Sequence, residues 1–95
     1  MKKTDILTGL TELANNLGIT IRKEKGINTE GICTVNDKRI ILLNKNSPIE
    51  RVIFVIARSL AEVGLEDLYI KPILREVIDS QLQNRAFYFK GEGIE

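Results

Sequence analysis

The hydrophobic positions change their period along the chain, and these changes mark the expected elements. From Asp5 to Leu17, apolar residues recur at spacings of three and four, which predicts an amphipathic helix. Gly18 follows directly and suits the left-handed conformation that commonly ends a helix. The pattern then turns to alternating or β-branched runs, which predict three strands over residues 19–25, 32–36 and 39–45.

Two local signals predict how the later elements are connected. Asn36-Asp37 separates the second and third expected strands, and because both residue types tolerate positive φ we expect a tight hairpin turn. Ser47-Pro48-Ile49-Glu50 has the form of a capping box with proline at the first helical position. The helix that follows runs to Val63 and is apolar over well over half of its circumference, so it is predicted to be buried at the centre of the fold.

The last third of the chain predicts one more helix and a tail. Leu68 and Ile70 are expected to attach the connector to the core, and Pro72 to start the helix. Its inner face is predicted to contain Ile73, Leu74, Val77, Ile78 and Leu82. Since 95 residues are typical of one domain, we predict a single α+β domain over residues 1–95. It has a three-stranded, mainly antiparallel sheet with helices on one face, and a tail from about residue 86 that is either flexible or part of an interface.

The charge balance and the cysteine content exclude several classes of protein. With 14 basic and 13 acidic residues, the chain has no long-range field to attract nucleic acid or an anionic membrane, so neither partner is expected. No apolar run reaches the roughly 18 residues that a membrane-spanning helix needs. Cys33 is the single cysteine and cannot form an internal disulfide. The expected location is the cytoplasm.

Few side chains suited to catalysis are present. The chain has no histidine and one cysteine, so a tetrahedral zinc site built from one chain is not expected. It has no glycine-rich loop of the kind that holds phosphates. Cys33 lacks the histidine that usually activates a cysteine nucleophile, and it is predicted to be a small apolar residue in a strand. We therefore expect no cofactor, no bound metal and no catalytic residue.

The order of the elements resembles that of a known scaffold. A helix and the start of a strand over residues 10–19 precede a hairpin over residues 31–44 and a capped helix over residues 47–62. This arrangement resembles the compact zincin-type metallopeptidases of bacterial stress and anti-repressor systems, and the similarity covers Leu10 to Val63. In that family the buried helix carries an HExxH motif, in which two histidines bind zinc and the glutamate is the general base.

The residues aligned with that motif depart from it at every functional position. The aligned pentapeptide is Arg58-Ser59-Leu60-Ala61-Glu62. Arg58 replaces the first ligand, Ser59 the general base and Glu62 the second ligand, and neither arginine nor serine can take the role it replaces. The resemblance therefore implies a degenerate scaffold that has kept its fold and lost its catalytic centre. Arg58 and Glu62 lie four residues apart on a helix, so they form either an ion pair in place of the metal or an ordinary solvent-exposed pair.

We expect a non-enzymatic scaffold or protein-interaction domain that self-associates as a homodimer. A short sheet with an open edge can accept a strand from a partner. A second expected contact surface is the C-terminal aromatic cluster, formed by Phe87, Tyr88 and Phe89.

Two alternatives come from other functional classes. The first is a hydrolase whose metal is held by carboxylates near the end of the central helix, from Glu62, Glu66 and Asp67. The second is a nucleic-acid-binding helix-turn-helix made from the central and third helices. The connector of about eight residues argues against it, because the usual turn has three or four.

Overall fold

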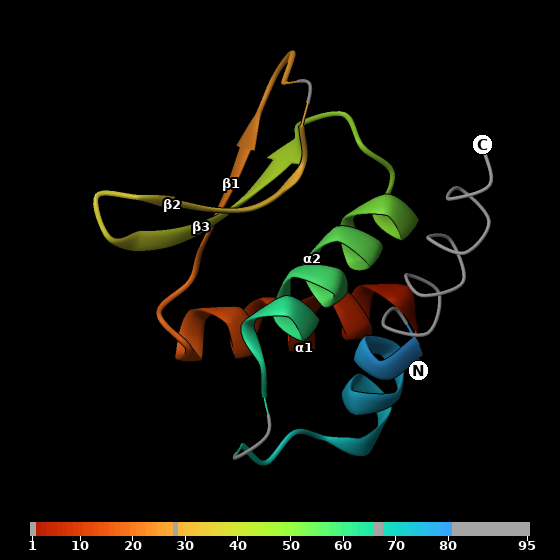
Figure 1. The fold of residues 1–95 in the computed structure, drawn as a ribbon. Helices are drawn as coiled ribbons and strands as arrows, with labels where there is room; N and C mark the ends of the chain where they lie inside the picture. The colour runs from red at the N-terminus through yellow and green to blue at the C-terminus, as the bar shows by residue number, and fades with distance from the viewer. Residues whose placement is uncertain (1, 28, 66–67, 81–95) are drawn as a thin grey trace, which may run out of the picture.

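Three helices and three strands form the described part of the chain (Figure 1). The computed structural model describes residues 2–27, 29–65 and 68–80. The elements are α1 (Lys3–Asn16), β1 (Thr20–Glu24), β2 (Gly31–Val35), β3 (Lys38–Asn44), α2 (Ile49–Val63) and a last helix over residues 72–80. The fold is therefore α+β, as predicted. None of the helices in the described ranges is long and apolar enough to cross a membrane.

The end of α1 follows the glycine signal in the sequence. Gly18 adopts a φ of 78°, and its N–H donates to the Asn15 carbonyl at 3.0 Å, while the Ile19 N–H donates to the Ala14 carbonyl at 2.9 Å. These two bonds form a Schellman motif, in which glycine takes the left-handed position without steric cost. Ile19 is consequently turned into the core, where its exposed fraction is 1%, immediately before β1 begins.

The sheet has the order β1-β3-β2 and is mixed rather than mainly antiparallel. β2 pairs with β3 in the antiparallel sense through the hairpin, whereas β1 pairs with β3 in the parallel sense, with Thr20 opposite Ile40. The most apolar strand takes the central position, where it has a neighbour on each side, and the charged β1 takes an edge. This arrangement buries Ile41 and Leu43 completely, which agrees with the rule that continuous apolar strands lie inside sheets.

The hairpin turn between β2 and β3 has the predicted conformation. Asn36 and Asp37 have φ values of 51° and 66°. Positive φ at both central residues defines a type I′ turn, whose twist matches that of the flanking strands. The turn places Val35 opposite Lys38 and thereby sets the register of the whole hairpin.

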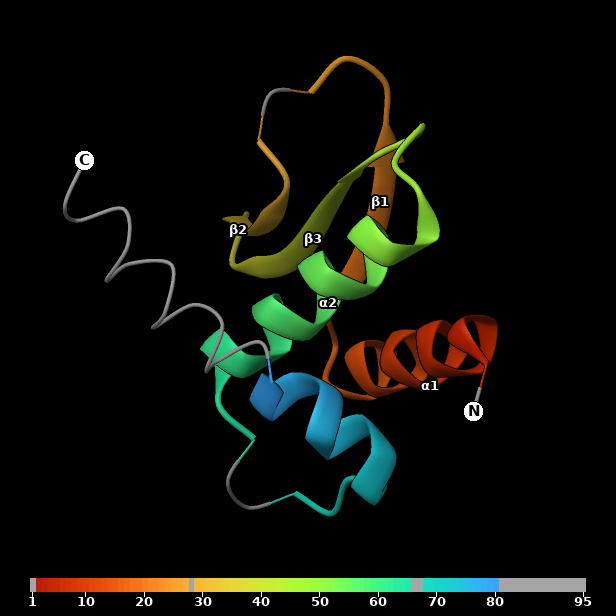
Figure 2. The same cartoon turned by 90° about the vertical axis from the view of Figure 1, so that its right-hand side faces the viewer.

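The helices lie on one face of the sheet, and α2 lies between the sheet and the helix over residues 72–80 (Figure 2). The side chains that β3 directs to this face, Ile41 and Leu43, pack in one cluster with Leu10 of α1 and with Ile56 and Leu60 of α2. Six residues of α2 are buried, and they cover several turns of the helix: Val52, Val55, Ile56, Ala57, Ser59 and Leu60. The prediction of a buried central helix is confirmed.

The start of α2 differs from the predicted capping box. The helix begins at Ile49, Pro48 is the capping residue, and no side chain caps the first turn. The Ser47 hydroxyl instead donates to Glu30 at 2.8 Å, and Glu50 accepts a hydrogen bond from the Lys3 ammonium at 2.7 Å. Contacts with residues distant in the sequence have therefore replaced the local ones that the motif predicted.

The last helix confirms part of its predicted inner face. Leu74 and Ile78 are buried, and Val77 is half-buried. Ile73 is 36% exposed because it lies one position, and so about 100° of helical rotation, away from Leu74. Gly9 allows this helix to approach α1 closely, since a Cβ at Gly9 would lie 2.9 Å from Leu74 Cδ1. Leu82 and the predicted tail from residue 86 lie outside the described residues.

The connector before that helix is attached to the core at one of the two predicted positions. Ile70 is buried, whereas Leu68 is 41% exposed, so the prediction for Leu68 is wrong. Tyr69, between them, is 86% exposed.

Candidate functional site

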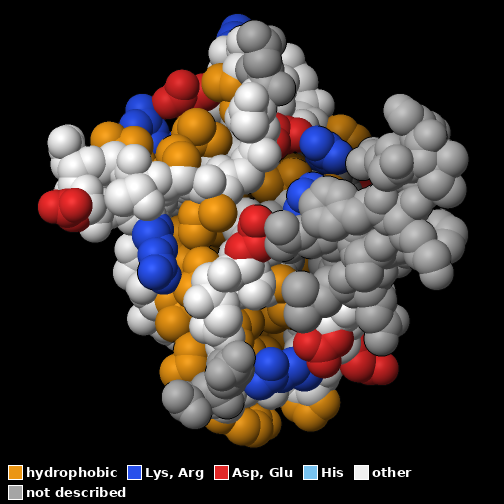
Figure 3. Space-filling view, viewed as in Figure 1, with side chains coloured by type: hydrophobic (Ala, Val, Ile, Leu, Met, Phe, Trp, Pro, Cys, Tyr) orange, Lys and Arg blue, Asp and Glu red, His pale blue; other side chains and the backbone are white. Residues whose placement is uncertain are grey.

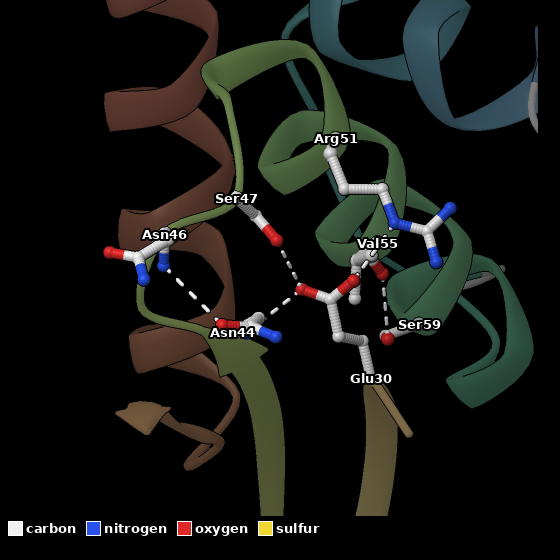
Figure 4. Close-up of polar contacts among 7 residues, drawn as sticks. All are labelled: Glu30, Asn44, Asn46, Ser47, Arg51, Val55 and Ser59. Carbon is white, nitrogen blue, oxygen red and sulfur yellow. Dashed lines mark hydrogen bonds and ion pairs between the residues drawn. The ribbon is translucent and has the colours of Figure 1, made fainter. Parts of the chain in front are cut away.

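The pentapeptide aligned with the zincin motif lies on the last turns of α2, and its serine faces inward. Ser59 is 1% exposed, and its hydroxyl donates to the Val55 carbonyl at 2.7 Å, one helical turn back (Figure 4). This bond occupies the only donor of the hydroxyl. A group that is buried and bonded to its own helix does not reach a substrate.

Arg58 and Glu62 lie on the outer side of the same helix. Arg58 is half-buried and Glu62 is exposed. None of the ion pairs between described residues joins these two side chains, although they are four residues apart. Within the described ranges, no group of three carboxylate or cysteine side chains is placed to hold a metal ion. Glu66, Asp67 and the aromatic residues Phe87, Tyr88 and Phe89 lie outside the described residues.

A pocket of about 210 Å³ opens between the β2–β3 hairpin and the end of α2. It is lined by Ile32, Cys33, Thr34, Arg39, Glu62 and Val63. The fold thus brings Glu62 from the helix beside Arg39 and Thr34 from the hairpin. On the face drawn in Figure 3, apolar side chains gather between the sheet and the helices, with acidic and basic side chains beside them. The lining of the pocket therefore includes both apolar and charged side chains.

The two edge strands of the sheet differ in charge. β1 carries Arg22, Lys23 and Glu24, and Arg22 forms an ion pair with Glu24 at 2.7 Å. β2 reads Gly-Ile-Cys-Thr-Val and has no charged side chain. Charged side chains on an edge normally oppose the addition of further strands. Of the two edges, only β1 has this protection.

The hairpin determines which backbone groups β2 directs away from β3. A two-residue turn closes with the backbone groups of its flanking residues, Val35 and Lys38, facing each other. Because facing pairs alternate along an antiparallel ladder, Gly31 and Cys33 also direct their N–H and C=O groups toward β3. The backbone groups of Ile32 and Thr34 then point outward. We call this outward row the β2 edge; among the described residues, β2 pairs with β3 alone.

A clamp around Glu30 holds the start of β2 in place. Glu30 Oε2 accepts hydrogen bonds from the Asn44 N–H and the Ser47 hydroxyl, each at 2.8 Å, and Oε1 accepts one from Arg51 Nε at 2.9 Å (Figure 4). The side chain is 10% exposed. Arg51 also lies over the ring of Phe54, 5.4 Å from its centroid. The clamp thus joins the loop before β2, the end of β3 and the first turn of α2.

The same contacts lower the pKa of Glu30 below its usual value. The largest cause is the hydrogen bond from the Asn44 N–H, and those from Arg51 and Ser47 act in the same direction, against the opposing effect of burial. The sequence pattern did not point to Glu30, because the partners of its carboxylate are 14 to 21 residues away. No motif connects residues at such distances.

Comparison of the chain with protein-family models, with curated proteins and with solved structures gave no match. The resemblance to zincin-type metallopeptidases therefore rests on the sequence pattern, and it stays a hypothesis.

Proposed function

We propose that this chain is a non-enzymatic protein-interaction domain that binds an extended polypeptide segment along the β2 edge. The observation that carries the proposal is the difference between the two edges of one sheet. β1 has the charges that oppose strand addition, whereas β2 is neutral and ends in β-branched residues. Val35, at the end of β2, is 46% exposed.

The pocket beside β2 supplies a means of selecting the bound segment. When a strand is added to a sheet, backbone hydrogen bonds provide affinity, and pockets for alternate side chains provide specificity. Ile32 and Thr34 belong to β2 and also line the pocket, together with Arg39 and Glu62. A segment bound to the β2 edge would direct every second side chain toward this pocket.

The position of Ser59 supports the non-enzymatic part of the proposal. It occupies the place of the general base in the pattern that the sequence resembles. Its hydroxyl is buried and donates to Val55, so it is not available to activate water or to attack a substrate. Glu62, at the place of the second metal ligand in that pattern, is one of the residues that line the pocket.

The test is a selection of random peptides, displayed on phage, against the full-length chain. The selected peptides are then measured on two variants of one residue. Thr34→Pro removes an N–H that points outward and is tolerated at an edge, whereas Thr34→Ala keeps the N–H and removes the side chain. We expect Thr34→Pro to weaken binding about tenfold, which corresponds to the loss of one hydrogen bond. We expect Thr34→Ala, which removes only a side chain of the pocket, to weaken binding clearly less than Thr34→Pro does.

Circular dichroism tests whether both variants are folded. If Thr34→Pro does not fold, hydrogen exchange in the original chain replaces it, and peptide binding should then slow the exchange of the Ile32 and Thr34 amides. Failure to select any peptide, or equal binding by both variants, would show that the β2 edge is not the binding surface.

A further inference from the structure

We infer that the strand accepted by the β2 edge is β2 of a second copy of this chain, paired in the antiparallel sense about Cys33. This inference rests on the proposed function and names its partner. The pairing joins two three-stranded sheets into one continuous sheet across a twofold axis. In such an isologous interface each copy contributes the same surface.

The sequence of β2 is compatible with itself in this register. With Cys33 on the axis, Ile32 lies opposite Thr34 of the partner subunit, and Gly31 lies opposite Val35 of the partner subunit. Neither pair contains a charge, so no like charges meet across the interface. Pairs that contain β-branched side chains also favour sheet formation.

The backbone groups of β2 are in the right phase for the same register. Ile32 and Thr34 direct their N–H and C=O groups outward, and in this pairing they lie opposite each other. Each of the two pairs exchanges two hydrogen bonds, which makes about four in total. Cys33 then forms a pair without hydrogen bonds, in which the two Cα atoms approach to about 4.5 Å.

The other edge of the sheet is less suited to an equivalent pairing about its middle residue. An antiparallel pair of β1 strands centred on Arg22 would place two arginines opposite each other. Like charges directly opposite each other destabilise a strand pair. The difference in charge between the two edges therefore favours a dimer interface at β2.

The size of the interface predicts a weak dimer. β2 has five residues, and a single strand pair of this length buries less than the roughly 1,200 Å² of the smallest stable interfaces. We therefore expect dissociation constants in the micromolar range or above. At lower concentrations the β2 edge stays available for another segment.

The first measurement is the mass of the full-length chain by analytical ultracentrifugation, from micromolar to millimolar concentration. We expect a reversible monomer–dimer equilibrium. Thr34→Pro should weaken the association about tenfold or more, and Thr34→Ala, which keeps the outward N–H, should weaken it clearly less. A chain that stays monomeric over this range overturns the inference.

The second measurement tests the register through disulfide formation at Cys33. Molecular oxygen, with a copper–phenanthroline catalyst, takes one electron and one proton from each of the two thiols as the S–S bond forms. The expected Cα separation lies within the range that a disulfide accepts. The control is the double variant Cys33→Ser/Thr20→Cys, which moves the single thiol to the opposite edge; Thr20 and Cys33 are both paired with Ile40. We expect rapid formation of a covalent dimer from the original chain and little from the control.

The outcomes separate this inference from the proposed function. If the chain stays monomeric but binds selected peptides more weakly after Thr34→Pro than after Thr34→Ala, the proposed function is retained and the dimer is refuted. A dimer that tolerates Thr34→Pro and does not cross-link at Cys33 uses another surface, which also refutes the inference. In that case the variants Phe87→Ala and Phe89→Ala test whether the C-terminal aromatic cluster holds the dimer together, with the monomer–dimer equilibrium as the measurement.

Discussion

Glu30 shows how a single residue connects segments that the sequence keeps apart. Its carboxylate joins Asn44 at the end of β3, Ser47 before α2 and Arg51 within α2. Ser47 was predicted to cap α2, but its hydroxyl is used in this contact instead. The strength of charge-assisted hydrogen bonds in a nearly buried site explains why this arrangement displaces the capping box.

The lowered pKa of Glu30 leads to a prediction about pH. A carboxylate with a folded-state pKa below its usual value of 4.5 stabilises the fold above that pH. This stabilisation is lost as the pH falls through the lower folded value. Glu30→Gln should therefore reduce the free energy of unfolding by about 1–3 kcal/mol at neutral pH, measured by urea denaturation. The difference in the free energy of unfolding between this variant and the original chain should shrink as the pH falls below the usual pKa.

The control is Glu12→Gln, at an exposed position of α1. This variant should change the free energy of unfolding little at neutral or at acidic pH.

At the scale of elements, the hairpin and α1 behave as their local sequence predicts. The type I′ turn and the Schellman motif both depend on residues that tolerate positive φ. The same hairpin sets the phase of the β2 edge, so a local turn determines which backbone groups face outward. The proposed binding surface therefore depends directly on the conformation of Asn36 and Asp37.

Replacing Asp37 by glycine should stabilise the protein. Asn-Gly is the preferred type I′ sequence, and glycine adopts the observed φ of 66° without steric cost. We expect a gain of up to about 1 kcal/mol in the free energy of unfolding, measured by thermal or urea denaturation. The left-handed backbone costs a residue with a Cβ roughly 1–2 kcal/mol, and the greater freedom of glycine in the unfolded chain offsets part of that gain. The matched control is Glu12→Gly, which puts glycine into the interior of α1 and should cost about 1 kcal/mol. A loss of stability for Asp37→Gly would contradict the assigned turn.

For the molecule as a whole, α2 is the element around which the others pack. It contacts the sheet on one side and α1 on another, and the helix over residues 72–80 lies across it from the sheet (Figure 2). Leu60 has no exposed surface and belongs to the common core cluster. Loss of its side chain would leave a cavity that neighbouring elements cannot fill independently.

Leu60→Ala should therefore lower the free energy of unfolding by about 2–5 kcal/mol. Leu68→Ala removes the same atoms from a side chain that is 41% exposed, and it should cost no more than about 0.5 kcal/mol. Urea denaturation of the two variants provides the comparison. A loss below about 1 kcal/mol for Leu60→Ala would mean that α2 is peripheral to the core.

The candidate site was predictable only in part. The sequence placed Arg58, Ser59 and Glu62 on one buried helix, and the structure confirms that helix. The sequence did not predict the hydrogen bond from the Ser59 hydroxyl to the Val55 carbonyl. Nor did it predict that Glu62 would line a pocket together with Arg39. The position of the neutral strand β2 at an edge of the described sheet also required the strand order, which depends on how the whole sheet is assembled.

The sequence by itself determined the elements, the central helix and the hairpin turn, because period and φ preference act between residues that are near neighbours in the chain. Tertiary structure decided the parallel pairing of β1, the clamp at Glu30 and the position of the pocket. The central place of β3 follows from burying Ile41 and Leu43 beneath α2, a gain that exists only once helix and sheet are packed together. Contacts between residues far apart in the chain depend on that packing, and no local pattern records them.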